Sequence, residues 1–218
     1  SEKLSLPDNY GKSLIYNSKM SAKVDSSLIH DGYELYHHAF FFSKNGSWAV
    51  IQQGMNKEKA RARRYHWYSK NIKDLIQEPH NGIVSDLIAP KNTVLNMTAK
   101  DSEKNRGISL ELVNSNYRTV MKDIEILRRH SSSLSRMMSA KIDGNQLTLI
   151  ELNDTEFSTH TVMNEDFGKS KYLEKILFKL CDEQPKSYKE LLSKEGVGPK
   201  TIRALSLVSE VIYGASPS

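Results

Sequence analysis

Residues 39–53 read AFFFSKNGSWAVIQQ, and this pattern predicts a β-hairpin. Apolar and aromatic residues lie on both sides of Asn45-Gly46. An Asn-Gly pair accepts the positive φ angles of a tight turn between two antiparallel strands. We therefore expect strands over residues 39–43 and 47–53.

Residues 61–68 read RARRYHWY and predict a third strand, after a break of the second strand at residues 54–56. Because side chains alternate across a strand, Arg63, Tyr65 and Trp67 would share one face. The other face would carry Ala62, Arg64, His66 and Tyr68. Neither face is plainly apolar, so the sequence does not indicate which one is buried.

Helical periodicity lies on both sides of this sheet. Met20, Val24 and Leu28 recur every four residues and predict a helix within residues 18–38. Gly32 is expected to bend or end that helix. Further apolar stripes predict helices over residues 101–116, 117–130 and 170–181.

Together these elements predict an α+β fold class. A first unit over residues 1–98 would hold the small antiparallel sheet with its helix, and a helical unit would cover residues 99–218. The second unit would end in a pair of helices at residues 187–213. Within it, residues 146–152 fit a strand or a connecting segment, and residues 153–164 fit a loop.

The composition fits a folded chain of 218 residues, with 38% hydrophobic and 26% charged residues. No apolar run approaches the roughly 20 residues of a membrane-spanning helix, so we expect no membrane segment. The N-terminus lacks the pattern of a secretory signal, and Cys181 alone cannot form an internal disulfide. We expect an intracellular, cytoplasmic protein, and the short tail at residues 214–218 suggests a fragment of a longer chain.

The positive charge is concentrated in one segment. The chain carries a net charge of +5, and residues 57–73 contain seven basic residues and one acidic residue. This segment therefore carries +6, and the rest of the chain carries −1. Such a cluster attracts polyanions, whereas a solvated helix face usually mixes both signs.

The predicted third strand lies inside this basic segment and is a candidate for nucleic-acid binding. Arg61, Arg63 and Arg64 can pair with phosphates as bidentate forks. Tyr65, Trp67 and Tyr68 can offer faces on which exposed bases stack. The alternative is an edge strand whose aromatic side chains pack inward.

Residues 196–201 read GVGPKT and join two short amphipathic segments. Pro199 suits the first turn of the second helix. Gly196 and Gly198 would let the backbone approach a phosphate, and the free amides at the helix start would face the anion. Lys194, Lys200 and Thr201 could add side-chain contacts. The alternative is a helix-helix turn that serves packing alone.

Residues 187–213 resemble the helix-hairpin-helix element shared by DNA glycosylases, repair nucleases, polymerases and ligases. The resemblance implies a grip on the DNA backbone with little sequence readout. In bifunctional glycosylases of this superfamily, the position of Lys200 holds a lysine that forms a Schiff base. Those enzymes also need an aspartate further along the chain, and this sequence ends before that point. Phosphate contact is therefore the stronger interpretation of Lys200.

Residues 21–80 hold the densest group of polar side chains that could perform catalysis. The candidate catalytic residues are Lys23, Asp25, Asp31, Glu34, His38, Gln53 and His66. Asp25, Asp31, Glu34 and His38 could hold Mg²⁺ or Mn²⁺, which polarises a phosphate and activates water. On a helix, His30 and Glu34 would share a face with His37 or His38 as metal ligands. The alternative is that these histidines and acids only satisfy one another through hydrogen bonds.

These polar segments, taken together, resemble the uncharacterised archaeal and bacterial family known as domain of unknown function 763, over nearly the whole chain. The resemblance implies no settled activity.

The first functional hypothesis is therefore a DNA-processing protein, namely a metal-dependent nuclease or a repair enzyme that acts on single-stranded or duplex DNA. The second is a non-catalytic DNA- or RNA-binding module that recruits other factors. The third is a glycosylase-lyase that uses Lys200. Nothing in the sequence specifies an oligomeric state.

Overall fold

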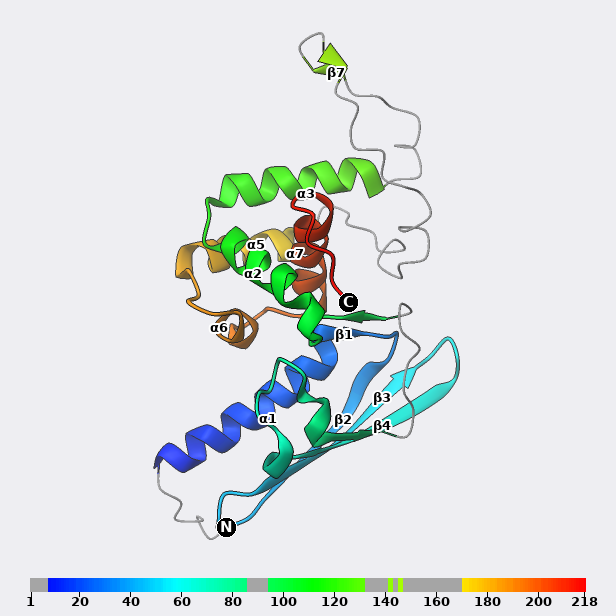
Figure 1. Cartoon of the computed structure of the whole chain (residues 1–218), viewed down its shortest axis with the longest axis vertical. Coiled ribbons are helices and arrows are strands. Elements are labelled where there is room, and N and C mark those ends of the chain that lie inside the picture. Colours follow the sequence, from blue (N-terminus) through cyan, green and yellow to red (C-terminus); the bar gives the residue numbers. More distant parts are fainter. Residues whose placement is uncertain (1–7, 86–93, 132–140, 143–144, 147–169) are drawn as a thin grey trace.

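The computed structural model describes residues 8–85, 94–131, 141–142, 145–146 and 170–218, and its fold is α+β (Figure 1). Its main sheet is antiparallel, with the strand order β2-β3-β4-β5. The strands are β2 (Glu34–Phe42), β3 (Trp48–Asn56), β4 (Arg61–Tyr68) and β5 (Ile83–Ser85). The expected fold class is confirmed.

The hairpin predicted around Asn45-Gly46 is confirmed as β2 and β3, with Phe42 paired to Trp48 and Gly46 at a φ of +95°. The predicted third strand is confirmed as β4. The expected break at residues 54–56 is wrong, because β3 continues to Asn56. A Cβ atom at Gly54 would lie 3.1 Å from Cβ of Tyr33, so this glycine permits close packing rather than ending the strand.

One face of the main sheet is covered by α1 (Asp8–Leu28) (Figure 1). Met20, Val24 and Leu28 are buried, as their four-residue spacing predicts. The helix ends at Leu28, however, so the part of the predicted helix that follows is wrong. The chain continues as β1 (Ile29–His30), turns at Gly32 with a φ of +81°, and enters β2. Pairing with β3 overrides the local helical pattern there.

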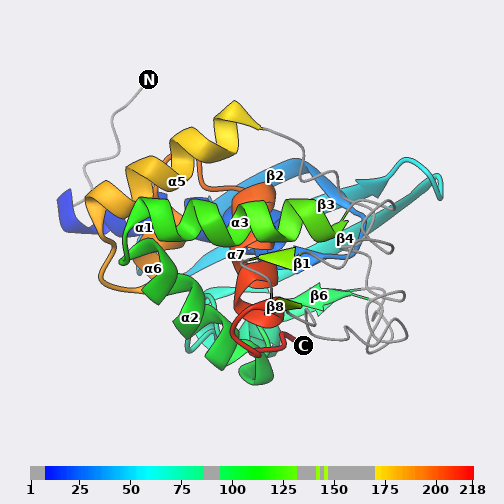
Figure 2. The same ribbon diagram turned by 90° about the horizontal axis from the view of Figure 1, so that it is seen from above.

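The helical part contains α2 (Glu103–Val113), α3 (Tyr117–Ser131), α5 (Lys171–Glu183), α6 (Tyr188–Ser193) and α7 (Pro199–Val211). These helices confirm the helical segments expected from the sequence. Figure 2 shows α7 among α2, α3 and α5, and it contacts all three. Ile202, Leu205 and Val208 of α7 are almost fully buried, and so are Leu191 and Leu192 of α6.

Short elements complete the described part. They are β6 (Leu95–Asn96), which pairs with β1, the pair β7 (Lys141–Ile142) and β8 (Asn145–Gln146), and the 3-10 turns η1 (Ser69–Asn71), η2 (Pro79–Gly82) and η3 (Lys100–Ser102). The segments expected at residues 146–152 and 153–164 lie almost entirely outside the described residues. No helix in the described ranges is long and apolar enough to cross a bilayer.

The two expected units are in direct contact. Helix α1 packs against α6 and α7 as well as against the sheet. Arg203 Nε of α7 donates to Nδ1 of the buried His30 at 2.6 Å. The backbone amide of Asn96 donates to the carbonyl of Ser218 at 2.7 Å. These contacts fix the position of the α6–α7 turn relative to the sheet.

Candidate nucleic-acid interface

The turn between α6 and α7 is built around Gly196 and Val197. Gly196 has a φ of +85°, and a Cβ atom there would lie 2.3 Å from Cδ1 of Ile176. Val197 is 4% exposed and belongs to the core. The hydroxyl of Tyr172 donates to the carbonyl of Gly196 at 3.2 Å. The first half of the turn is therefore closely packed on α5 and requires glycine at position 196.

The second half of the turn is open. Gly198 is the N-cap of α7 and has an extended backbone, and a Cβ atom at this position would meet no described atom within 4 Å. No side chain caps this helix, and its first internal bond runs from the amide of Ile202 to the carbonyl of Gly198. The amides of Lys200 and Thr201 precede that bond and have no acceptor within the helix. An anion could therefore approach the amide of the exposed Lys200 past Gly198, whereas Thr201 is 2% exposed.

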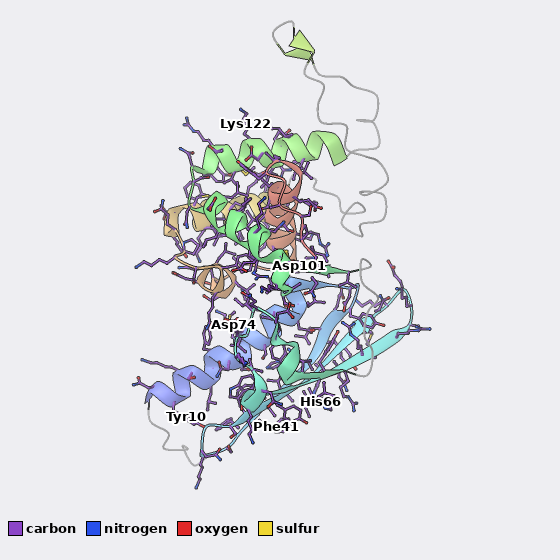
Figure 3. The ribbon with its side chains drawn as sticks, viewed as in Figure 1. Tyr10, Phe41, His66, Asp74, Asp101 and Lys122 are labelled. Carbon is purple, nitrogen blue, oxygen red and sulfur yellow. The ribbon has the colours of Figure 1, made fainter. Side chains whose placement is uncertain are left out.

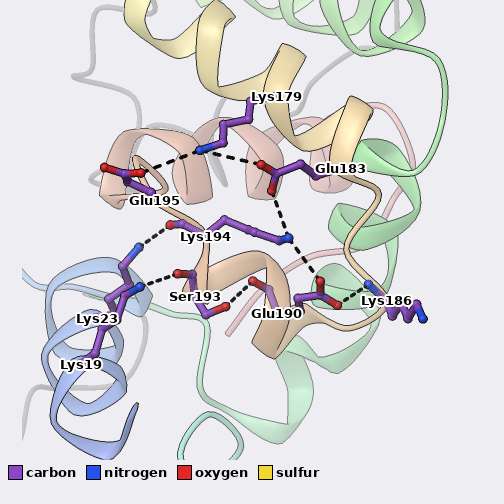
Figure 4. Close-up of polar contacts among 9 residues, drawn as sticks. All are labelled: Lys19, Lys23, Lys179, Glu183, Lys186, Glu190, Ser193, Lys194 and Glu195. Atoms are coloured by element: carbon purple, nitrogen blue, oxygen red, sulfur yellow. Dashed lines mark hydrogen bonds and ion pairs between the residues drawn. The ribbon is translucent and has the colours of Figure 1, made fainter. Parts of the chain in front are cut away.

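Two lysines of α1 hold the turn from the other side (Figure 4). Lys23 Nζ donates to the carbonyl oxygens of Lys194 at 2.9 Å and Val197 at 2.7 Å. Lys19 Nζ donates to the carbonyl oxygen of Ser193 at 2.8 Å. Burial, and to a smaller extent the Lys19 ammonium, lower the pKa of Lys23 to about 8, so it is charged at neutral pH. Lys23 is a predicted catalytic residue, but in the structure it holds the turn through these two hydrogen bonds.

Replacing Lys23 by methionine is expected to lower the free energy of unfolding by about 1–2 kcal/mol, because two carbonyls lose a charged donor while the aliphatic stem remains. Lys19→Met is the matched control on the same helix, since Lys19 is exposed and contacts one carbonyl. Its expected effect is below about 0.5 kcal/mol. Urea unfolding measures both, and equal effects of the two variants would contradict the assigned role of Lys23.

The side chain of Lys194 is engaged by acids rather than directed at a ligand (Figure 4). Its Nζ lies 3.0 Å from a carboxylate oxygen of Glu183 and 3.3 Å from one of Glu190. These two carboxylates raise the pKa of Lys194. Thr201 is 2% exposed, so its hydroxyl is buried within the helix packing. Of the side chains expected to contact phosphate at this turn, Lys200 alone is exposed.

Beneath the sheet, Arg63 of β4 is the centre of a buried polar cluster. Its guanidinium forms an ion pair with Asp31, and both side chains are almost fully buried. Arg63 Nε donates to the hydroxyl of Tyr65, and the guanidinium lies 4.7 Å from the ring centre of Tyr33. Burial raises the pKa of Asp25 to about 6, and the nearby Arg63 opposes this rise. The cluster is therefore an internal charge network that joins α1, the β1–β2 turn and β4.

The inward register of β4 corrects part of the predicted nucleic-acid surface. Tyr65 is 9% exposed and Trp67 is 2% exposed, because both belong to the hydrophobic core. The expectation that Tyr65 and Trp67 offer stacking faces is wrong, whereas Tyr68 is 47% exposed, and Arg63 is committed to Asp31 rather than to a phosphate. The alternation itself is confirmed. The opposite face, with Arg64 and its neighbours, is the one that meets solvent.

His38 lies on the inward face of β2 and is hydrogen-bonded on both ring nitrogens. Its Nε2 lies 2.9 Å from the hydroxyl of Ser18, and its Nδ1 accepts from Nε2 of Gln52 at 3.2 Å. Burial, and then the nearby His37, lower the pKa of His38, which keeps the ring neutral. A neutral ring with a proton on Nε2 satisfies both contacts.

The four residues expected to bind a metal are not brought together. Asp25 and Asp31 lie around Arg63, His38 bonds to Gln52, and Glu34 is solvent-exposed, where it pairs with Lys57 at 3.3 Å. Within the part of the chain that the structure describes, no three His, Cys, Asp or Glu side chains gather as a metal site. The proposed helix face of His30, Glu34 and His37 or His38 is wrong, because residues 34–42 form a strand.

The two remaining catalytic candidates, Gln53 and His66, lie on the outward face of the sheet. The Gln53 amide nitrogen donates to the hydroxyl of Tyr36 at 2.6 Å, and its oxygen accepts from Arg64 Nη2 at 2.7 Å. The candidates are thus divided between the two sides of the sheet. Sequence reasoning missed Tyr36 and Phe41 on this outward face, although pairing the hairpin in register would have placed Phe41 in the same row as Tyr68.

Comparison with known proteins identifies a family. A family model described as "Protein of unknown function (DUF763)" matches residues 1–218. No curated protein matches the chain, and neither does any solved structure. Because the match covers the whole sequence, the chain belongs to the uncharacterised family DUF763.

Proposed function

We propose that this protein binds nucleic acid and grips a phosphate backbone at the α6–α7 turn. The observation that carries the proposal is the uncapped N-terminus of α7, where a side chain at Gly198 would meet open space and Lys200 is exposed. Lys19, Lys23 and Tyr172 each bond a carbonyl of the turn, so the amides are held in place before a ligand arrives. A preorganised set of amide donors is suited to an anionic oxygen.

The basic segment supports a polyanionic ligand. Arg61, Arg64, Lys59 and Lys70 are exposed, whereas Arg63 is neutralised by Asp31. Contacts from backbone amides and lysines position a duplex without reading its bases. The exposure of Lys200 also favours phosphate contact over Schiff-base chemistry, since an activated lysine needs a desolvated site.

A pair of glycine variants tests the turn. Gly198→Ala is expected to leave the free energy of unfolding unchanged, because its backbone is extended and its Cβ would meet no neighbour. The added methyl group would obstruct the approach of a phosphate and weaken binding to a labelled DNA duplex by about tenfold. Gly196→Ala is expected to lower the free energy of unfolding by about 2 kcal/mol, owing to its positive φ and the contact with Ile176.

Fluorescence anisotropy of the full chain with a duplex, at several salt concentrations, measures the affinity, and urea unfolding measures the stability. Wild-type affinity should fall steeply with salt, because counterions are released. Unchanged affinity in Gly198→Ala, or no binding by the wild type, would contradict the proposed function. The same mixtures with Mg²⁺, Mn²⁺ or EDTA report on cleavage. Metal-dependent products would support a DNA-processing enzyme, and intact DNA would support a binding module.

A further inference from the structure

The outward face of the main sheet carries exposed aromatic and basic side chains. Helix α1 covers the opposite face, as the alternating burial along β3 and β4 shows. Tyr36 is 51% exposed, Phe41 56% and Tyr68 47%. These fractions are high for large aromatic side chains, which are normally buried. We propose that this face binds the bases of a single-stranded nucleic acid, an inference that rests on the proposed function.

The register of the sheet sets the spacing of these side chains. Phe41 and Tyr68 lie in one row across β2, β3 and β4, with the small Ala49 between them. Neighbouring strands are about 4.8 Å apart, so the two aromatic residues stand about 10 Å from each other. Ala49 leaves room over the strand between them. A planar base can therefore contact either ring from this gap.

The next rows along the sheet add polar groups that suit bases and phosphates. On this face of β4, His66 lies two residues before Tyr68, and Arg64 lies two residues before His66. Each two-residue step along the strand is about 6.7 Å. The amide of Gln53 accepts two hydrogen bonds from Arg64, which holds the guanidinium against the sheet. A fixed guanidinium can pair with a phosphate as a fork or stack on a base. Figure 3 labels Phe41 and His66 on this face.

The charge of the face favours a polyanion over a second protein. Among the described residues of its strands, Glu34 is the acid that faces outward, and Lys57 pairs with it. Arg64 is exposed on this face, and Arg61 is exposed at the start of β4 in the alternation set of Arg63. Single-strand binding surfaces combine such basic groups with aromatic platforms. Bases in a duplex are already stacked, so these platforms select unpaired strands.

Alanine variants of the full chain test the inference. Phe41→Ala and Tyr68→Ala are each expected to weaken binding of a short labelled single strand by about tenfold, the effect of losing one stacked base. Phe178→Ala is the matched control, because Phe178 is 59% exposed but lies on α5. Arg64→Ala is expected to reduce the slope of log affinity against log salt by about one. Thermal unfolding should be unchanged in the two exposed aromatic variants.

The outcomes separate this inference from the proposed function. Tyr68→Ala and Phe41→Ala should leave duplex affinity unchanged, and Gly198→Ala should reduce it. If Phe41→Ala and Tyr68→Ala both bound single strands with wild-type affinity, the single-strand site would be overturned and the proposed function would stand. If these variants lost self-association but bound single strands unchanged, the single-strand site would also be overturned. The face would then be assigned to contacts between copies of this chain. Absence of binding to any nucleic acid would overturn both.

Discussion

Replacing Arg63 by methionine lowers the free energy of unfolding by about 3–5 kcal/mol, the expected cost of removing one partner from a buried ion pair. Asp31 would be left in the interior without its counterion, and Tyr65 would lose the donor to its hydroxyl. Asp25 would lose the cation that opposes the rise of its pKa. Three groups are therefore affected by one substitution, and urea unfolding at neutral pH measures the loss.

Arg64→Met is the matched control, because Arg64 neighbours Arg63 on β4 but is exposed. Its expected effect on the free energy of unfolding is within about 0.5 kcal/mol. The double variant Arg63→Met with Asp31→Asn is expected to be more stable than Arg63→Met alone, since the unpaired charge is removed. If Arg63→Met and Arg64→Met were equally stable, the buried ion pair would not contribute as described.

The stability of the wild type is expected to fall as the pH rises from about 4 to about 6, and Asp25 is the expected cause. Its pKa in the folded protein is about 6, above the value of 3.8 for a free aspartate. In this window the folded state holds a proton that the unfolded state has lost, so raising the pH favours unfolding. A pKa shift of this size lowers the free energy of unfolding by about 3 kcal/mol, and the whole loss is reached above pH 6.

Asp25→Asn removes this titration. The difference in free energy of unfolding between Asp25→Asn and the wild type is expected to grow by about 3 kcal/mol in favour of the variant between acidic and neutral pH. Glu34→Gln is the control, because Glu34 is exposed and pairs with the exposed Lys57. A difference between Asp25→Asn and the wild type that stays constant with pH would show that Asp25 is not responsible.

The two faces of β4 divide the charge of the basic segment. Arg63 stabilises the interior by pairing with Asp31, whereas Arg64 on the outward face remains exposed for a ligand. A net charge of +6 over residues 57–73 therefore overstates the charge that a polyanion can reach at this strand. The same alternation places Trp67 in the core and Tyr68 in solvent.

Local patterns in the sequence were sufficient for most of the secondary structure. The Asn45-Gly46 turn, the alternation along residues 61–68 and the apolar spacing of the later helices each depend on residues close in sequence. Pro199 after two glycines likewise marked the start of α7. Such signals reflect backbone preferences and side-chain periodicity, which do not require knowledge of distant segments.

Tertiary structure alone decided which face of β4 is buried, where α1 ends and what Lys23 contacts. Strand alternation defines two faces, but only the packing of the core against this sheet selects the one with Tyr65 and Trp67 as the inner face. The helix ends at Leu28 because the following residues pair with other strands. Lys23 reaches the carbonyl of Val197 across 174 positions of sequence. The sequence by itself thus determined the elements and their two-sided character, whereas long-range packing determined their faces and partners, because those depend on which distant surfaces exclude water together.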